Sequence, residues 1–187
     1  MTKRVIESDL SLAILGLLSL GPLSGYGLRK VFLTTAMRAF SASPGAIYPA
    51  LRRLEKDGLI EGTVQKTHTL RPRRVFALTK QGRAALVETV TRPVTRDDVV
   101  RRVDHLLLRF SFMSGLVGNE KIRRFLDTLA KETEGYLRKL EAELEATGPS
   151  MPFSGRAAFE QGVEGFRGIV RMAKKMRAEL ETAQNGK

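Results

Sequence analysis

The side chains in this sequence that could do chemistry are mostly cations and tyrosines. The chain has no cysteine and two histidines, His68 and His105, which lie far apart. A cysteine nucleophile, a thiol redox centre and a cysteine-based zinc site are therefore excluded, and a histidine-based metal or catalytic site is disfavoured. The sequence also contains no paired-carboxylate, Ser-His-Asp, phosphate-loop or dinucleotide motif. We therefore expect neither an enzyme nor a bound cofactor or metal.

Basic residues gather in two short stretches, residues 43–56 and residues 65–74. The first is predicted to be a helix with small residues at its front and with Tyr48, Arg52 and Arg53 on one face. The second has a basic tip and no acidic residue. Arginine matches the geometry of phosphates and of guanine edges, and tyrosine offers a hydroxyl and a flat ring. The chemistry indicated is the recognition of phosphates and base edges.

The predicted nucleic-acid contacts divide into two groups. Base-edge contacts are expected from Ala46, Tyr48 and Arg52, because a small residue such as Ala46 permits a close approach. Phosphate contacts are expected from Tyr26, Arg53, Lys66, Arg71, Arg73 and Arg74. The set of predicted nucleic-acid contacts also includes three residues at the start of this helix or within it: Ser43, Gly45 and Pro49.

The charge of the chain supports a polyanionic partner. Its 187 residues include 32 Lys and Arg against 20 Asp and Glu, a net charge of +12. Residues 1–95 hold 15 of the basic and 6 of the acidic residues, a net charge of +9 and three quarters of the surplus. Nucleic acid and an acidic membrane surface both fit this excess. The membrane is disfavoured because the basic residues do not follow one long amphipathic helix.

An apolar run, residues 10–20, follows Lys3 and Arg4 and superficially resembles a secretory signal. Glu7 and Asp9 interrupt the pattern, and no Ala-x-Ala-like cleavage site follows. The run is also shorter than the roughly 20 apolar residues that span a bilayer. We expect a buried helix in a cytoplasmic protein.

Capping residues predict the helices that position the basic stretches. Ser8, Ser24 and Ser43 are each followed by an apolar pattern of helical period, and Thr79 begins a fourth such pattern. The third helix is predicted to bury Ile47, Leu51 and Leu54 and to end at Asp57-Gly58. Gly25 and Gly27, in the first turn of the second helix, allow a close approach of either a neighbouring helix or a phosphate.

The period then changes to that of two short strands, residues 59–64 and 74–78, joined by the basic tip. Three helices followed by a two-stranded hairpin form a winged helix-turn-helix. In that arrangement the third helix enters the major groove of DNA, and the hairpin reaches phosphates or the minor groove. A winged-helix module that binds protein without sequence-specific DNA binding is the alternative.

At these residues the sequence resembles the PadR family of transcriptional regulators. The resemblance covers roughly residues 8–90 and rests on the motifs at residues 15–28, 43–60 and 73–83. It accounts for Pro49, because a Tyr-Pro pair at this place is a family habit. The chain departs from the family at residues 32–37, which leaves the end of the second helix open. The resemblance implies a homodimeric DNA-binding repressor, and some members release DNA on binding a small aromatic molecule.

The C-terminal half is predicted to be helical. Thr95 and Asp98 have capping-box spacing, and one helix is expected from there to Phe110. Asn119 is expected to cap a long helix, and residues 148–152 form a turn before another. The fold class is therefore mainly α with a small β-hairpin: a winged helix-turn-helix domain at residues 1–92 and a coiled-coil-like helical dimerisation domain at residues 93–187.

Two apolar stripes with alternating spacings of three and four run along these long helices. The predicted dimerisation residues are Ile122, Leu126, Leu129, Tyr136, Leu140, Leu144, Phe159, Val163, Phe166 and Val170. Either the stripes pair between two chains or the helices form a hairpin folded back onto the N-terminal domain. The first is preferred, because long PadR members have a helical C-terminal region used for dimerisation. The expected function is that of a homodimeric regulator, with an effector pocket less favoured than core packing for the aromatic residues.

Overall fold

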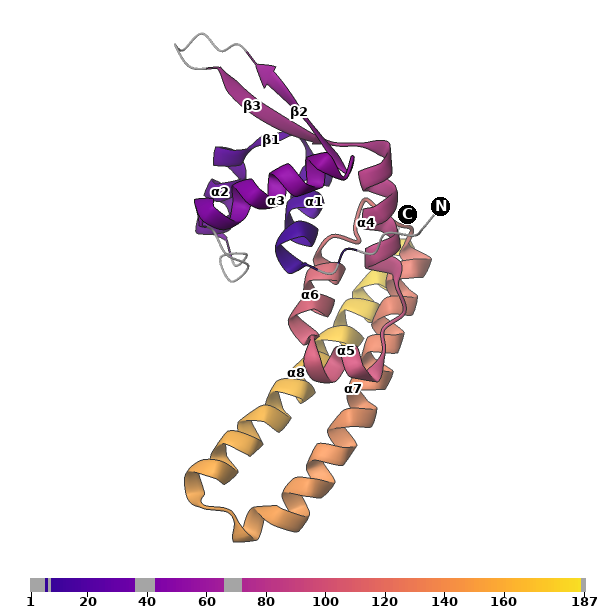
Figure 1. The fold of residues 1–187 in the computed structure, drawn as a ribbon. Coiled ribbons are helices and arrows are strands. Elements are labelled where there is room, and N and C mark those ends of the chain that lie inside the picture. The colour runs from indigo at the N-terminus through magenta and orange to yellow at the C-terminus, as the bar shows by residue number, and fades with distance from the viewer. Residues whose placement is uncertain (1–5, 7, 36–42, 66–71, 186–187) are drawn as a thin grey trace. The chain divides into compact units, whose positions relative to one another are not determined.

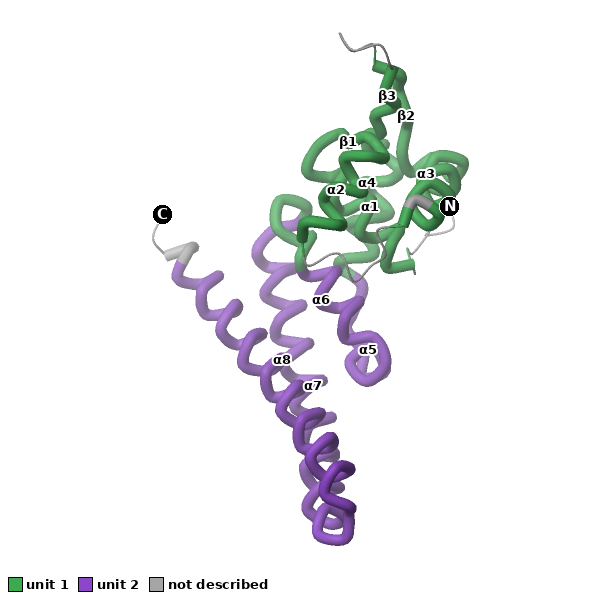
Figure 2. The backbone as a smooth tube through the Cα atoms, turned by 90° about the vertical axis from the view of Figure 1, so that its left-hand side faces the viewer, with its two compact units in different colours: residues 1–91, 111–116 green, residues 92–110, 117–187 purple. Residues whose placement is uncertain are grey.

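The computed structural model describes residues 6, 8–35, 43–65 and 72–185 of the chain. It is mainly helical with a small three-stranded antiparallel sheet (Figure 1), which confirms the predicted fold class. The chain divides into two compact units (Figure 2). Unit 1 comprises residues 1–91 and 111–116, and unit 2 comprises residues 92–110 and 117–187. Within the described residues, no helix combines the length and the apolar character needed to cross a membrane.

The first three helices of unit 1 begin where their capping residues predict. Helix α1 is Asp9–Leu20, α2 is Gly25–Thr34 and α3 is Pro44–Lys56. Each is preceded by a serine, Ser8, Ser24 or Ser43, whose hydroxyl accepts a hydrogen bond from a backbone N–H of the first turn. The sequence leaves open where the second helix ends, and in the structure α2 ends at Thr34.

Helix α1 forms the centre of unit 1. Every residue from Leu12 to Leu18 is buried, because neighbouring elements cover this helix on all sides. One of those neighbours is the segment 111–116, which belongs to unit 1. Its Phe112 ring lies so close to Gly16 that a β-carbon at position 16 would come within 2.4 Å of the ring. Gly16 therefore gives Phe112 its place in the core of unit 1.

The sheet has three strands in the order β1-β3-β2. Strands β2 (Ile60–Gln65) and β3 (Arg73–Leu78) form the predicted hairpin, called the wing below, with Ile60 opposite Leu78 and Gln65 opposite Arg73. The sequence predicts two strands, and this count is wrong: β1 (Leu23–Ser24) pairs with the outer side of β3. Two residues are too few to show the alternation that marks a strand.

The base of the wing is fixed by hydrogen bonds at the start of helix α4 (Lys80–Thr91). The Thr79 hydroxyl donates to the carbonyl oxygen of Gly58 over 2.7 Å and accepts from the Gly82 N–H over 2.9 Å. Gly58 has a φ of 71°, the left-handed conformation that ends α3. Thr79 is thus the predicted cap of α4, and it also ties that helix to the end of α3.

Unit 2 begins with the predicted capping box of Thr95 and Asp98. The prediction of a single helix after this capping box is wrong. The chain forms two helices, α5 (Arg96–Arg101) and α6 (Val103–Ser111). They are separated at Arg102, which has φ −142° and ψ 38°. The apolar residues stay in helical register across the break, so the pattern did not reveal it. Helix α7 is Asn119–Thr147, and Asn119 is its first residue rather than its cap, which is Gly118.

Helices α7 and α8 (Phe153–Asn185) form an antiparallel hairpin around a short 3-10 turn, Gly148–Ser150. They pack on each other within one chain, whereas the preferred interpretation of the sequence pairs their apolar stripes between two chains. The Tyr136 and Phe166 rings meet edge to face with centroids 5.1 Å apart. Acidic residues seven apart on α7 pair with basic residues of α8 as Asp127–Arg177, Glu134–Lys174 and Glu141–Arg167. These pairs link the two helices in one register.

A buried cation lies where α6 meets the start of unit 2. Arg109 is 1% exposed, donates a hydrogen bond to the carbonyl oxygen of Arg92 and lies 5.2 Å from the centroid of the Phe125 ring. Burial, with the nearby charge of Arg92, lowers the pKa of Arg109 to about 10. The guanidinium therefore stays charged at neutral pH, and the ring and the carbonyl oxygen stabilise it.

Asp98 gives unit 2 a pH-dependent stability. Its carboxylate accepts hydrogen bonds from the Thr95 hydroxyl over 2.7 Å and from Arg92 over 2.9 Å. Burial acts to raise the pKa of Asp98, but the hydrogen bonds from Thr95 and the charges of Arg92 and Arg109 outweigh it, so the pKa lies below its ordinary value. The unfolded chain binds more protons near pH 4, so this stability is present above that pH and is lost as the pH falls further.

We expect Asp98→Asn to lower the free energy of unfolding at pH 7 by about 1–3 kcal/mol, because it removes a charge-assisted acceptor. Urea unfolding at several pH values measures the effect. The difference between wild type and variant should shrink as the pH falls below 4, where Asp98 becomes protonated in both states of the wild type. A difference that stays constant down to pH 2 would contradict this role.

Candidate nucleic-acid interface

Helix α3 has one buried face and one exposed face. Ile47, Leu51 and Leu54 are buried, which confirms the predicted core stripe. Tyr48 and Arg52 therefore lie on the exposed side, and 44% of the surface of Tyr48 is exposed. The helix continues through Pro49 despite the missing backbone donor at that position.

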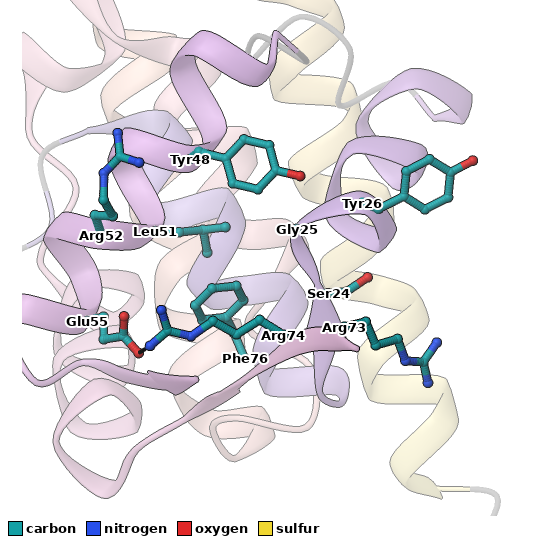
Figure 3. A pocket seen from close by; sticks show the side chains of 10 residues that line it. All are labelled: Ser24, Gly25, Tyr26, Tyr48, Leu51, Arg52, Glu55, Arg73, Arg74 and Phe76. Carbon is teal, nitrogen blue, oxygen red and sulfur yellow. Dashed lines mark hydrogen bonds and ion pairs between the residues drawn. The ribbon is translucent and has the colours of Figure 1, made fainter. Parts of the chain in front are cut away.

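An open groove runs between the start of α2, the exposed face of α3 and strand β3 of the wing (Figure 3). Tyr26, Tyr48 and Arg52 line it from the helices, and Arg73 and Arg74 line it from β3. These five residues, which the sequence predicts as contacts in three separate segments, are therefore brought together in space. The other residues that line the groove are Ser24, Gly25, Leu51, Glu55 and Phe76.

The tyrosine of α3 is positioned by a glycine of α2. Gly25 is buried, and a β-carbon there would come within 2.7 Å of the Tyr48 ring. The sequence leaves open whether Gly25 serves helix packing or a phosphate, and the structure places the Tyr48 ring against it. Tyr26, the next residue, is 69% exposed. One tyrosine is thus held against the protein while the other extends into solvent.

The two arginines of the wing have different surroundings. Arg74 pairs with Glu55 over 2.7 Å, and its guanidinium lies 5.5 Å from the centroid of the Phe76 ring. Arg73 is exposed and reaches Gln65 on the neighbouring strand over 3.5 Å. Figure 3 shows the two side chains running in opposite directions from β3. Arg74 is therefore already engaged within the protein, whereas Arg73 extends into solvent.

The remaining predicted contacts lie outside the lining of this groove. Ser43, Gly45 and Ala46 form the start of α3, and Arg53 is exposed farther along the helix. Lys66 and Arg71 fall outside the described residues, so the structure says nothing of their positions. Sequence reasoning missed Glu55, although it is the single acidic residue between positions 43 and 56. A single carboxylate among several cations is the feature of the sequence that could have indicated an ion pair at Glu55.

Comparison with known families and sequences gives two findings. The family model described as "Transcriptional regulator PadR-like family" matches residues 14–88. The chain is also 31% identical over 152 residues to the "Negative transcriptional regulator PadR" of Bacillus subtilis. That match covers 78% of this chain and 82% of the relative.

Solved structures of PadR proteins are also similar to this chain. Bacillus subtilis PadR in complex with operator DNA matches with a TM-score of 0.44 and 24% identity, over 91% of this chain and 98% of that chain. The same protein in complex with p-coumaric acid matches with a TM-score of 0.41 and 22% identity, over 92% and 99% of the two chains. The family match and the identity to the curated relative carry the assignment: the chain belongs to the PadR-like family of transcriptional regulators.

Proposed function

We propose that this chain is a DNA-binding repressor that acts as a homodimer on a pseudo-palindromic operator. The observation that carries the proposal is the groove, where exposed tyrosine and arginine side chains of α2, α3 and the wing converge on one surface. A helix bearing such residues fits the major groove of DNA, and a neighbouring hairpin fits the flanking backbone. The name of the Bacillus subtilis relative, a negative regulator, supports repression.

The residues divide between reading bases and holding phosphates. Ala46, Tyr48 and Arg52 stand on α3 where base edges would lie, and arginine pairs well with guanine there. Tyr26, Arg53 and Arg73 are exposed and available to phosphates. Lys66 and Arg71 are proposed for the same role from the sequence. Arg74 is the exception among the predicted phosphate contacts, because Glu55 already holds it.

Dimerisation is proposed through the α7–α8 hairpin. Ile122, Leu126, Leu129, Val163 and Val170 are buried within one chain. The partly exposed members of the predicted set, Tyr136, Leu140, Leu144, Phe159 and Phe166, remain available to a second chain. Two recognition helices about 34 Å apart would then meet successive major grooves. Sedimentation equilibrium of the full chain should give twice the monomer mass, and a monomer would contradict the proposal.

A small aromatic effector is part of the proposal, because Bacillus subtilis PadR has been solved with p-coumaric acid. Three of the side chains that could line such a pocket have partners within this chain: Phe112 and Met113 are buried, and Phe110 stacks on Phe125. Thermal-shift screening with p-coumaric acid, other phenolics and cationic drugs tests for an effector. No shift with any of them would favour a regulator without a ligand.

Replacing Arg71 and Arg73 together with alanine tests the role of the wing. We expect weaker binding to operator and random duplexes alike, because phosphate contacts carry no sequence information. The plot of log affinity against log salt concentration should become less steep by about 3–4 for a dimer, at about 0.9 for each lost contact. Fluorescence anisotropy with a random duplex measures both quantities. An unchanged affinity for that duplex would refute the wing assignment and favour a protein-binding winged helix.

A further inference from the structure

Of the described residues that line the groove, Glu55 alone is acidic. A carboxylate there would repel DNA phosphates, so its presence calls for a physical reason. We propose that Glu55 is a positioning residue that locks the wing to the recognition helix and withholds Arg74 from nonspecific phosphate contact. This inference rests on the proposed DNA-binding function and assigns a role in specificity to a residue outside the predicted contact set.

One oxygen atom of Glu55 joins three elements. Its Oε1 accepts a hydrogen bond from Arg74 Nη2 on β3 over 2.7 Å and another from the Gly62 N–H on β2 over 3.0 Å. Glu55 itself belongs to α3, so the helix is linked to both strands of the wing. Figure 3 shows the Arg74 side chain running toward Glu55 beside the Phe76 ring. We call Glu55, Gly62 and Arg74 the Glu55 clamp.

Steric constraints explain why the residue at position 62 of the clamp is glycine. A β-carbon at position 62 would come within 2.5 Å of Arg74 Nε and 2.8 Å of Glu55 Oε1. Any side chain at this position would therefore displace both charged groups. Glycine weakens a strand interior, so its place in β2 indicates close approach of other groups. Here those groups are the two partners of the clamp.

The clamp contributes more to DNA binding than to folding. The Arg74 and Glu55 side chains are 53% and 27% exposed, and solvated ion pairs of this kind add little to stability. At a DNA surface the same pair matters more, because each cation that reaches a phosphate strengthens binding to every sequence. Glu55 cancels one such charge and fixes the angle of the wing. Both effects favour the operator over random DNA.

Three variants separate geometry from charge. Glu55→Gln removes the charge that holds Arg74. Gly62→Ala leaves the net charge unchanged. Its methyl group would meet the side chains of Arg74 and Glu55 and so displace the clamp. Glu61→Gln removes a carboxylate from an exposed neighbouring position, and serves as the control for charge alone. Each full-length variant is titrated by fluorescence anisotropy against a random duplex and against a duplex selected from a random library, and circular dichroism confirms that it folds.

The ratio of the two affinities, selected over random, is the specificity measured. We expect Glu55→Gln to lower this ratio about tenfold and to steepen the salt slope on random DNA by about 0.9 for each wing. Adding Arg74→Met to Glu55→Gln should remove that gain in slope. Gly62→Ala should lower the ratio with little change in slope, and Glu61→Gln should leave the ratio within about twofold.

Ratios within twofold of wild type for both Glu55→Gln and Gly62→Ala would overturn the proposal. An effect of Glu61→Gln as large as that of Glu55→Gln would also overturn it, because charge alone would then explain the result. If wild type shows no salt-dependent binding to either duplex, the proposed DNA-binding function fails first. The two failures are therefore distinguishable.

Discussion

Replacing Gly82 with alanine is expected to lower the free energy of unfolding by about 3 kcal/mol, near the upper end of the usual cost of overpacking. A β-carbon at this position would lie 1.9 Å from the carbonyl oxygen of Leu59. That oxygen is backbone and cannot rotate away. It also accepts hydrogen bonds from the backbone N–H and the hydroxyl of Thr79, each over 3.1 Å. The clash therefore outweighs the roughly 1 kcal/mol that alanine gains over glycine within a helix.

Gly162 provides the matched control, because it is an exposed glycine of α8 with no atom within 4 Å of its would-be β-carbon. Gly162→Ala should raise the stability by up to about 1 kcal/mol. Urea unfolding followed by circular dichroism measures both variants. Equal stabilities of Gly82→Ala and wild type would show that α4 can move away from Leu59, contrary to the packing described.

Replacing Arg52 with alanine is expected to reduce operator affinity by about tenfold to a hundredfold in each half-site, the value of a bidentate contact to guanine. Arg52 is exposed on the face of α3 that lines the groove. A base contact contributes to one sequence and a phosphate contact contributes to all of them. The loss on a random duplex should therefore be much smaller than on the selected operator.

The control for Arg52→Ala is Arg124→Ala, which removes the same charge from an exposed position of α7, where Arg124 reaches Glu120 over 3.5 Å. Anisotropy titrations against both duplexes measure the two variants. Equal losses on operator and random DNA would assign Arg52 to phosphates. An unchanged affinity for both duplexes would contradict the assignment of α3 to the DNA interface.

Features controlled by local chemistry could be predicted from the sequence. The caps at Ser8, Ser24, Ser43 and Thr79 follow from side chains that bond their own first turn. The capping box of unit 2 follows in the same way. The buried stripe of α3 follows from periodicity, and it determines which arginines face solvent. For this reason the sequence alone places Tyr48 and Arg52 on one surface of the helix.

Features that depend on distant partners could not be predicted. Strand β1 exists because two residues meet β3 more than fifty positions away. The α7 stripe is consistent with a partner in either chain, and only the structure pairs Tyr136 with Phe166 of the same chain. Arg74 has the residue type of a phosphate contact, but its partner Glu55 is nineteen positions away. The same limit applies to Glu55 itself, whose role depends on two strands that its own segment does not contain.

The salt dependence of duplex binding tests the DNA-binding proposal most directly. The proposal assigns four cations per chain to phosphates, Arg53, Lys66, Arg71 and Arg73, which would give about eight phosphate contacts in a dimer. Log affinity should then fall linearly with log salt concentration with a slope of about −7, measured with the full chain by fluorescence anisotropy. A slope near zero, or no binding to duplex DNA at low salt, would contradict the account.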